Sequence, residues 1–198
     1  MARPDKNTRN AQILDAAFRM LDEKGFSGLS MQAVARAARA SNETLYNWYG
    51  DKTGLFSHLI AQNTGALRAQ LDALPDQPPL DQLAAFGPLL LTMLLGPRAI
   101  ALNKAAAADD SGTLGPALAA AGRDTVKPWV EEVMARAIAD RQLGGGSAQT
   151  LAETYLTLLI GDLQIRRVTG AIPPLSEAQI AGRAGRAIAL LEKIFPPD

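Results

Sequence analysis

The chain has 198 residues, 47% of them hydrophobic, and its 20 basic and 20 acidic residues give a formal net charge of zero. It has no cysteine, which excludes disulfides, thiolate catalysis and cysteine-ligated metals, and the charge balance argues against a protein that coats nucleic acid. The longest strongly apolar run, at residues 89–95, is too short for a membrane span, and the polar N-terminus lacks the apolar core of a signal peptide. We therefore expect a cytoplasmic protein.

The N-terminal stretch predicts a polar arm followed by a helix. Arg3, Lys6 and Arg9 could reach DNA phosphates or a minor groove, or they could simply be solvated. A first helix is expected over residues 7–24, where apolar residues recur at helical spacing, and Gly25 is a natural C-terminal stop. Residues 1–60 carry two more basic than acidic side chains, which is weak support for binding DNA.

Two short helices are predicted next, over residues 30–38 and 42–48. Arg39 and Ala40 form the turn between them, and Ser41 is a good N-cap, since its hydroxyl can accept from free backbone N–H groups. The second helix buries Leu45 and turns a polar set outward: Asn42, Glu43, Thr44, Tyr46 and Asn47. A short helix with a small polar N-terminal end can enter a DNA major groove and read base edges.

The remaining residues predict six further helices and no strand, so the expected fold is all-α with about nine helices. Proline- and glycine-rich breaks separate these helices. The expected ranges are 51–74, 80–95, 97–108, 114–143, 148–168 and 177–195. Ser176 and Gln179 form a capping box for the last of them.

The run VARAARASNETLYNWYGDKTGLF, at residues 34–56, closely resembles the helix-turn-helix of TetR-family transcriptional regulators. The resemblance covers about residues 8–60 with high specificity and the rest only in outline. It implies a three-helix DNA-binding domain over residues 1–50, a bridging helix from residue 51, and an effector-binding and dimerisation domain over residues 51–198. The positions that match the family's DNA-contacting set are Gln32, Arg39, Asn42, Thr44, Tyr46, Asn47 and Lys52.

Within this set, Tyr46 and Lys52 most resemble phosphate-gripping residues, which fix register without reading sequence. Asn42, Glu43, Thr44 and Asn47 are the expected base readers, because Asn can pair with adenine and Glu can accept from cytosine. Arg39 stands where the family often has a glycine. Either the turn differs there, or Arg39 tolerates a positive φ while adding a phosphate contact. Gly54 replaces the usual acid, which predicts a slightly less stable start of the bridging helix.

The helix expected over residues 148–168 is apolar on more than one face, and glycines interrupt it and the last helix. Periodicity alone allows two interpretations. The helices could form the core of their own chain, or they could pair with a second copy. The family resemblance favours the second, a homodimer with a four-helix interface.

The resemblance also implies a pocket for a small lipophilic effector in the C-terminal region. Candidate lining residues are Phe86, Met93, Asn103, Trp129, Met134, Tyr155 and Asp162, although core packing explains the apolar members equally well. Asp162 needs a partner, such as Arg166, Arg167 or a group across the dimer.

The sequence offers little for catalysis. His58 is the only histidine, and there is no nucleophile elbow, phosphate-binding loop or convincing carboxylate metal site. We expect no enzyme, no cofactor and no bound metal. The predicted function is a transcriptional regulator that leaves a near-palindromic operator when its ligand binds. The alternative is a small-molecule-binding protein with this fold that has lost DNA binding.

Overall fold

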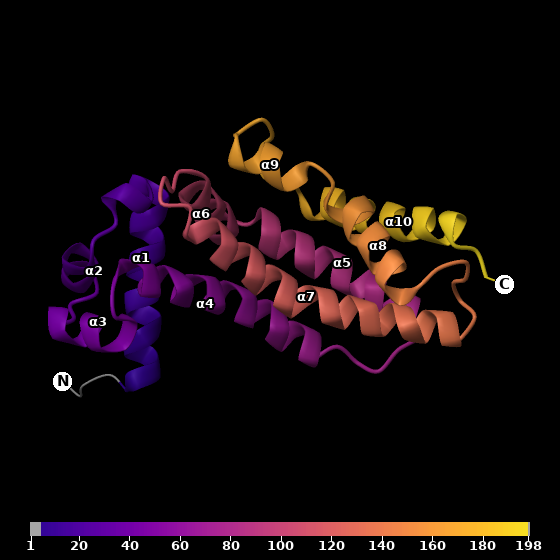
Figure 1. Ribbon diagram of the computed structural model, residues 1–198, viewed down its shortest axis with the longest axis horizontal. Coiled ribbons are helices and arrows are strands. Elements are labelled where there is room, and N and C mark those ends of the chain that lie inside the picture. The colour runs from indigo at the N-terminus through magenta and orange to yellow at the C-terminus, as the bar shows by residue number, and fades with distance from the viewer. Residues whose placement is uncertain (1–4, 198) are drawn as a thin grey trace. The chain divides into compact units, whose positions relative to one another are not determined.

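The computed structural model describes residues 5–197, with residues 122–125 described by their backbone alone. The regular elements of this part of the chain are all helices, and it contains no strand (Figure 1). The all-α prediction is therefore confirmed. The helices are α1 (Lys6–Gly28), α2 (Met31–Ala37), α3 (Asn42–Tyr49), α4 (Lys52–Asp72), α5 (Pro79–Leu95), α6 (Pro97–Ala107), α7 (Leu114–Ala139), α8 (Ala148–Ile160), α9 (Leu163–Val168) and α10 (Glu177–Ile194).

The first compact unit comprises residues up to 63 together with residues 97–121. It contains α1 to α3, the first part of α4, α6 and the start of α7. Its core is one cluster of buried apolar residues, in which Ile13, Val34, Leu45 and Leu55 are completely inaccessible. The segment around α6 adds Leu102 to the same cluster, because α6 packs against α1. The DNA-reading helices therefore share their core with residues from the middle of the chain.

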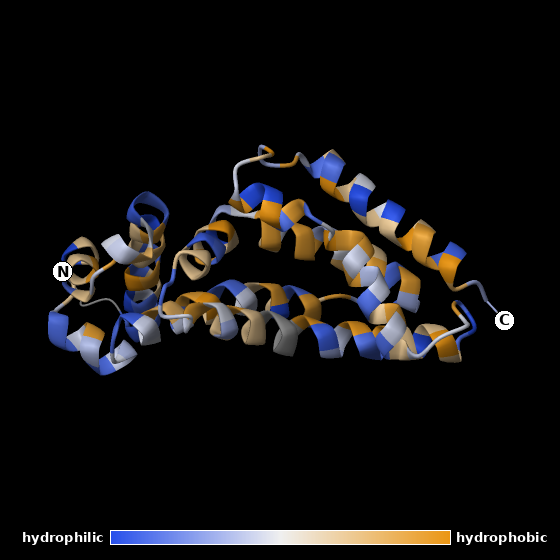
Figure 2. Ribbon diagram, turned by 45° about the horizontal axis from the view of Figure 1, so that its top comes forward, coloured by the Kyte–Doolittle hydropathy of each residue, from blue (hydrophilic) through white to orange (hydrophobic). Residues whose placement is uncertain are grey.

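The second unit comprises residues 64–96 and residues from 122 onward. Here α10 packs against α5 and α8, and the core holds Phe86, Met134 and Tyr155. Hydrophobic and hydrophilic residues alternate along α10 up to the C-terminal label (Figure 2), as expected of a helix with one face on this core. Gln82 is buried and accepts a hydrogen bond of 2.6 Å from Nη2 of Arg136.

Two helix ends differ from the sequence predictions in an informative way. Gly25 does take a positive φ of 67°, as expected of a stop, but the last three residues of α1 continue as a further turn beyond this kink. The single helix predicted over residues 148–168 is two helices, because α8 ends at Gly161 with a φ of 49°. Asp162 therefore precedes α9 and does not lie inside an apolar helix.

The compact units do not divide the chain at residue 50. The first unit takes in the start of α4 and the whole of α6, since both contribute to its core. The functional division predicted at residues 1–50 and 51–198 remains a prediction. In the described residues no single helix is long and apolar enough to cross a membrane, although α5 and α6 taken together would meet that criterion.

Candidate nucleic-acid interface

The helix pair α2–α3 is defined by serine caps at both starts. The Ser30 hydroxyl accepts from the backbone N–H of Ala33 at 3.2 Å, and the Ser41 hydroxyl accepts from that of Thr44 at 3.0 Å. Each cap satisfies a donor that would otherwise lack a partner, which contributes about 1 kcal/mol. The predicted start of the second helix at Asn42 is therefore confirmed.

Arg39 occupies the turn with a φ of 53°, a conformation in which a glycine is usually found. Of the two alternatives the sequence left open, the structure has the positive φ. Nη1 of Arg9 reaches the turn from α1 and donates to the carbonyl oxygens of Ala38 at 3.2 Å and Arg39 at 3.3 Å. Arg9 thus braces the turn. No local sequence signal indicates this role, since the partners are about thirty residues away.

The outer face of α3 is polar and open. Four side chains on this face are exposed: Asn42, Glu43, Tyr46 and Asn47. Tyr46 is 51% accessible to solvent although it is a large side chain. Thr44 is only half-buried, and its hydroxyl lies 2.8 Å from that of Ser41. The helix therefore presents amide, carboxylate and phenol groups on one side, while Thr44 takes part in the cap.

The inner face of α3 fixes the helix on its unit. Leu45 is fully buried, and the Tyr49 hydroxyl donates to Oδ1 of Asn10 on α1 at 2.6 Å. Burial raises the pKa of Tyr49 to about 12, because the phenolate would lose its hydration. The ring of His58 packs edge-on against that of Tyr49, with centroids 5.0 Å apart, and its Nδ1 hydrogen-bonds to the Gly54 carbonyl at 2.9 Å.

The turn from α3 to α4 depends on Gly54. A Cβ at this position would lie 1.9 Å from the Tyr49 carbonyl oxygen, so any side chain would collide with the backbone. The Gly54 N–H donates to Oδ1 of Asp51 at 2.7 Å, which caps the start of α4. From the sequence, Gly54 predicts a slightly less stable start of α4. The structure shows a steric reason for glycine at this position, because a side chain would collide with the Tyr49 carbonyl oxygen.

Three further members of the predicted DNA-contacting set flank α3 in the sequence. Gln32 on α2 and Arg39 in the turn are exposed. Nζ of Lys52 lies 4.0 Å from the centroid of the Phe26 ring, and partial burial lowers its pKa. At the start of α1, Nζ of Lys6 lies 5.8 Å from the centroid of the Trp48 ring, whereas Arg3 lies outside the described residues.

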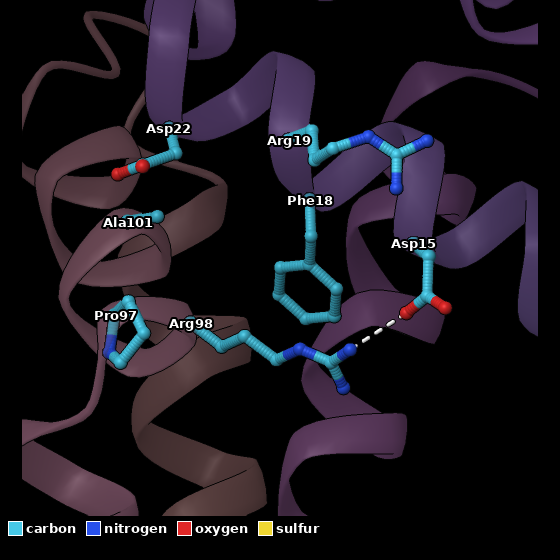
Figure 3. A pocket seen from close by; sticks show the side chains of 7 residues that line it. All are labelled: Asp15, Phe18, Arg19, Asp22, Pro97, Arg98 and Ala101. Carbon is cyan, nitrogen blue, oxygen red and sulfur yellow. Dashed lines mark hydrogen bonds and ion pairs between the residues drawn. The ribbon is translucent and has the colours of Figure 1, made fainter. Parts of the chain in front are cut away.

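Within the same unit, α6 is fastened to α1 by Arg98 (Figure 3). Its Nη2 donates to Oδ1 of Asp15 at 2.6 Å, and its guanidinium lies 4.7 Å from the Phe18 ring centroid. The two contacts line a surface pocket of about 370 Å³. The sequence does not predict the pairing of Arg98 with Asp15, because 83 residues separate the two partners.

Only some of the candidate effector residues lie together in the structure. In the second unit Phe86 and Trp129 have ring centroids 4.7 Å apart, and the buried Tyr155 hydroxyl donates to the Leu83 carbonyl at 2.9 Å. Met134 is buried and Met93 half-buried in the same cluster. The Phe86 ring packs against both Trp129 and Tyr155, and all five side chains belong to one core cluster.

The two polar candidates lie elsewhere. Asn103 is on α6 in the first unit, where its side chain donates to the Ala99 carbonyl at 2.8 Å. Asp162 is exposed, and its Oδ2 lies 3.7 Å from Nη1 of Arg166, the first of its predicted partners. Among the described residues no group of three or more His, Asp or Glu side chains could hold a metal ion.

Two capped helices joined by a tight turn, with the second presenting a polar outer face, define a helix-turn-helix protein of the DNA-binding class. Comparison with known families agrees. Residues 13–59 match the model of bacterial regulatory proteins of the tetR family, and residues 81–194 match that of the AefR-like transcriptional repressor C-terminal domain. The chain belongs to the TetR family of transcriptional regulators.

Curated relatives match part of the chain. The HTH-type transcriptional regulator BetI of Burkholderia thailandensis is 40% identical over 50 residues, which are 25% of this chain and 26% of BetI. BetI of Burkholderia mallei is 31% identical over 77 residues, 37% of this chain and 40% of that protein. The chain thus matches well under half of the length of these curated relatives. Their names indicate regulators rather than enzymes.

Solved structures match along nearly the whole chain. A TetR transcriptional regulator from Agrobacterium tumefaciens is 26% identical with a TM-score of 0.77, over 96% of this chain and 95% of that one. The flavonoid-responsive regulator FrrA is 25% identical with a TM-score of 0.72, over 96% and 97%. Regulators of this family bind operator DNA and act as dimers.

Proposed function

We propose that this protein is a dimeric, sequence-specific repressor that inserts α3 into the major groove of operator DNA. The observation that carries the proposal is the outer face of α3, where four exposed polar side chains stand on a helix whose inner face is fully anchored. Such a helix brings donors and acceptors to base edges at little cost in desolvated apolar surface. The cytoplasmic location predicted from the sequence is part of the same proposal, because bacterial operators lie there.

The contacts divide into two kinds in this proposal. Tyr46, Lys52, Arg39 and Gln32 would grip phosphates and fix the register, while Asn42, Glu43 and Asn47 would read bases. Thr44 would contribute through the cap on α3, since its hydroxyl already lies beside that of Ser41. The exposure of Gln32, Arg39 and Tyr46 supports this division, and Lys52 is partly exposed.

We propose that the dimer forms through α8 and α10. Leu190 and Ile194 on α10 are 45% and 51% exposed and lie one helical turn apart, so together they form an apolar pair on the outer surface of this helix. A Cβ on Gly185 of the same helix would meet nothing within 4 Å, so a second helix could approach closely there. Two copies would present two α3 helices to successive major grooves, roughly 34–36 Å apart.

The cluster around Phe86, Met93, Trp129, Met134 and Tyr155 is our candidate site for a small lipophilic effector. The apolar character of this cluster, in which the Tyr155 hydroxyl is held on the Leu83 carbonyl, suits the lipophilic effector that the family resemblance implies. Binding there would release the operator if the ligand prefers the conformation that does not bind DNA. Residues 51–198 would thus carry effector binding and dimerisation.

The test is a salt titration of binding to DNA that flanks the protein's own gene, with random DNA of equal length as reference. We expect specific binding that weakens steeply with salt. Lys52→Ala should weaken binding to both DNAs by a similar factor. Asn47→Ala should instead reduce the ratio of the affinity for the flanking DNA to the affinity for random DNA. Arg68→Ala, an exposed arginine on α4 paired with Asp72, is the control and should change neither.

Absence of any preference for the flanking DNA at low salt would refute DNA regulation and favour the alternative of a ligand-binding protein. Equal effects of Lys52→Ala and Asn47→Ala on both DNAs would refute the division between phosphate grip and base reading.

A further inference from the structure

The ammonium group of Lys52 is held on an aromatic ring. Lys52 begins α4, shortly after the recognition helix α3, and its Nζ lies over the Phe26 ring at 4.0 Å from the centroid. This distance is within the range at which a cation is attracted to the negative face of a ring. Both side chains are partly buried, so water weakens the attraction less than at a fully exposed site. Phe26 therefore restricts where the ammonium group can lie before any DNA is present.

The Phe26 ring is itself fixed by its surroundings. Phe26 follows the kink at Gly25, and its carbonyl oxygen accepts from the Leu29 N–H at 3.1 Å. Its ring meets that of the fully buried Phe56 edge-on, with centroids 5.5 Å apart and planes at 77°. Lys52 and Phe56 are four residues apart on α4, so one face of this helix places both the cation and the buried ring against Phe26.

The positive charge of Lys52 remains available to a further partner. In the described part of the chain Lys52 has no ion pair, because the carboxylate of the neighbouring Asp51 instead accepts from the Gly54 N–H at 2.7 Å. A carboxylate bound to the ammonium group would compete with a phosphate for it. A neutral ring holds the group in place and leaves its charge uncompensated.

We propose that Phe26 is a positioning residue for DNA binding, whose ring holds the Lys52 ammonium group ready for a phosphate of the DNA backbone. The inference rests on the proposed role of Lys52 as a phosphate contact. A mobile lysine side chain loses rotamer freedom when it binds, and the ring removes part of that loss in advance. Because phosphates carry no sequence information, the ring strengthens binding to operator and random DNA alike.

The first experiment measures affinity for the flanking DNA and for random DNA. Phe26→Leu keeps an apolar side chain but removes the ring, and both affinities should fall by a similar factor of about two to five. Phe26→Tyr keeps a ring and should bind as the unmodified chain does. Phe18→Leu is the matched control, since it removes a ring that carries the Arg98 guanidinium in the same unit, and it should change neither affinity.

A double-mutant cycle separates positioning from a general effect on the fold. In a chain that already carries Lys52→Ala, Phe26→Leu should cause no further loss of affinity, because the ring then has no cation to hold. Losses that add in the double variant, or an equal loss in Phe18→Leu, would show that Phe26 acts through the stability of the unit and would overturn the proposal.

Nuclear magnetic resonance tests the contact in the unmodified protein. The Hε resonance of Lys52, assigned by its absence in Lys52→Ala, should lie upfield of that of Lys193, an exposed lysine on α10. The upfield shift should vanish in Phe26→Leu and persist when operator DNA is bound. A Lys52 resonance without this shift in the free protein, or one that loses it on DNA binding, would also overturn the proposal.

The same measurements distinguish this inference from the proposed function. If Lys52→Ala binds both DNAs as the unmodified chain does, the phosphate role of Lys52 and the positioning role of Phe26 are both refuted. If Lys52→Ala weakens binding and Phe26→Leu does not, only the role of Phe26 is refuted.

Discussion

At the scale of single residues, Arg39 carries a backbone conformation that its side chain disfavours. An L-residue other than glycine at a φ of 53° costs about 1–2 kcal/mol. Two hydrogen bonds from Arg9 to the carbonyl oxygens of this turn hold it in place. The positive φ of Arg39 therefore lowers the stability of the fold, and it is accompanied by a guanidinium group in the turn that precedes the recognition helix.

We predict that Arg39→Gly raises the free energy of unfolding by about 0.5–1 kcal/mol, because relief of the strain exceeds the added flexibility of glycine in the unfolded chain. Urea denaturation measures this change. In the same experiment Arg36→Gly, at an exposed position within α2, should lower stability by about 1 kcal/mol. The strain argument fails if both variants are destabilised equally.

A second residue-scale prediction concerns Tyr49, whose pKa burial raises from its ordinary value near 10 to about 12. The folded state keeps this proton after the unfolded chain has lost it, so the contribution is complete below pH 10 and is lost as pH rises toward 12. We expect the free energy of unfolding to fall over this range, and to fall less in Tyr49→Phe.

Part of the decline should persist in Tyr49→Phe, because burial also raises the pKa of Tyr155. Tyr46→Phe, at a tyrosine that is 51% exposed, should retain the full decline. An identical pH profile for Tyr49→Phe and Tyr46→Phe would contradict this account.

At the scale of elements, α4 contains two glycines with opposite roles. Gly54 lies against the Tyr49 carbonyl, whereas a Cβ on Gly65 would meet nothing within 4 Å. We predict that Gly54→Ala lowers stability by about 1–3 kcal/mol through this collision and weakens operator binding, because Tyr49 ends the recognition helix.

Gly65→Ala is the matched change on the same helix. It should raise stability by about 1 kcal/mol, since alanine favours a helix interior over glycine. Circular dichroism during denaturation compares the two. If Gly54→Ala is as stable as Gly65→Ala, the close approach at the α3–α4 turn is not what selects glycine.

Sequence predicted elements well wherever their signal was local. The caps at Ser41 and Ser176 lie within three residues of their partners, and each is present. The break at Gly161 was missed because apolar residues continue on both sides of it. Arg98 and Asp15 could not be paired from sequence, since only the packing of α6 on α1 brings them together.

At the scale of the whole molecule, the central prediction is self-association. We expect the protein to be a dimer in solution, and Leu190→Glu to shift it toward monomer, because a carboxylate would be buried without a partner in the proposed interface. Operator affinity should fall in parallel. Size-exclusion chromatography with light scattering measures the mass.

The control is Ala135→Glu, at an exposed position on α7, which should remain a dimer. A monomeric unmodified protein, or a fully dimeric Leu190→Glu, would exclude α10 from the interface.

The candidate effector residues show what the sequence cannot predict about the whole molecule. The sequence indicated five apolar members of one cluster, but it could not tell that Asn103 belongs to the other unit.

The packing of α6 on α1 also has a consequence for synthesis of the chain. The core of the DNA-reading unit includes Leu102 and Leu114, so a nascent chain that has only released its first sixty residues cannot complete that core. At about 5–20 residues per second, the ribosome needs several further seconds to deliver the missing segment. The recognition helix therefore gains its full support only after more than half of the protein has been translated.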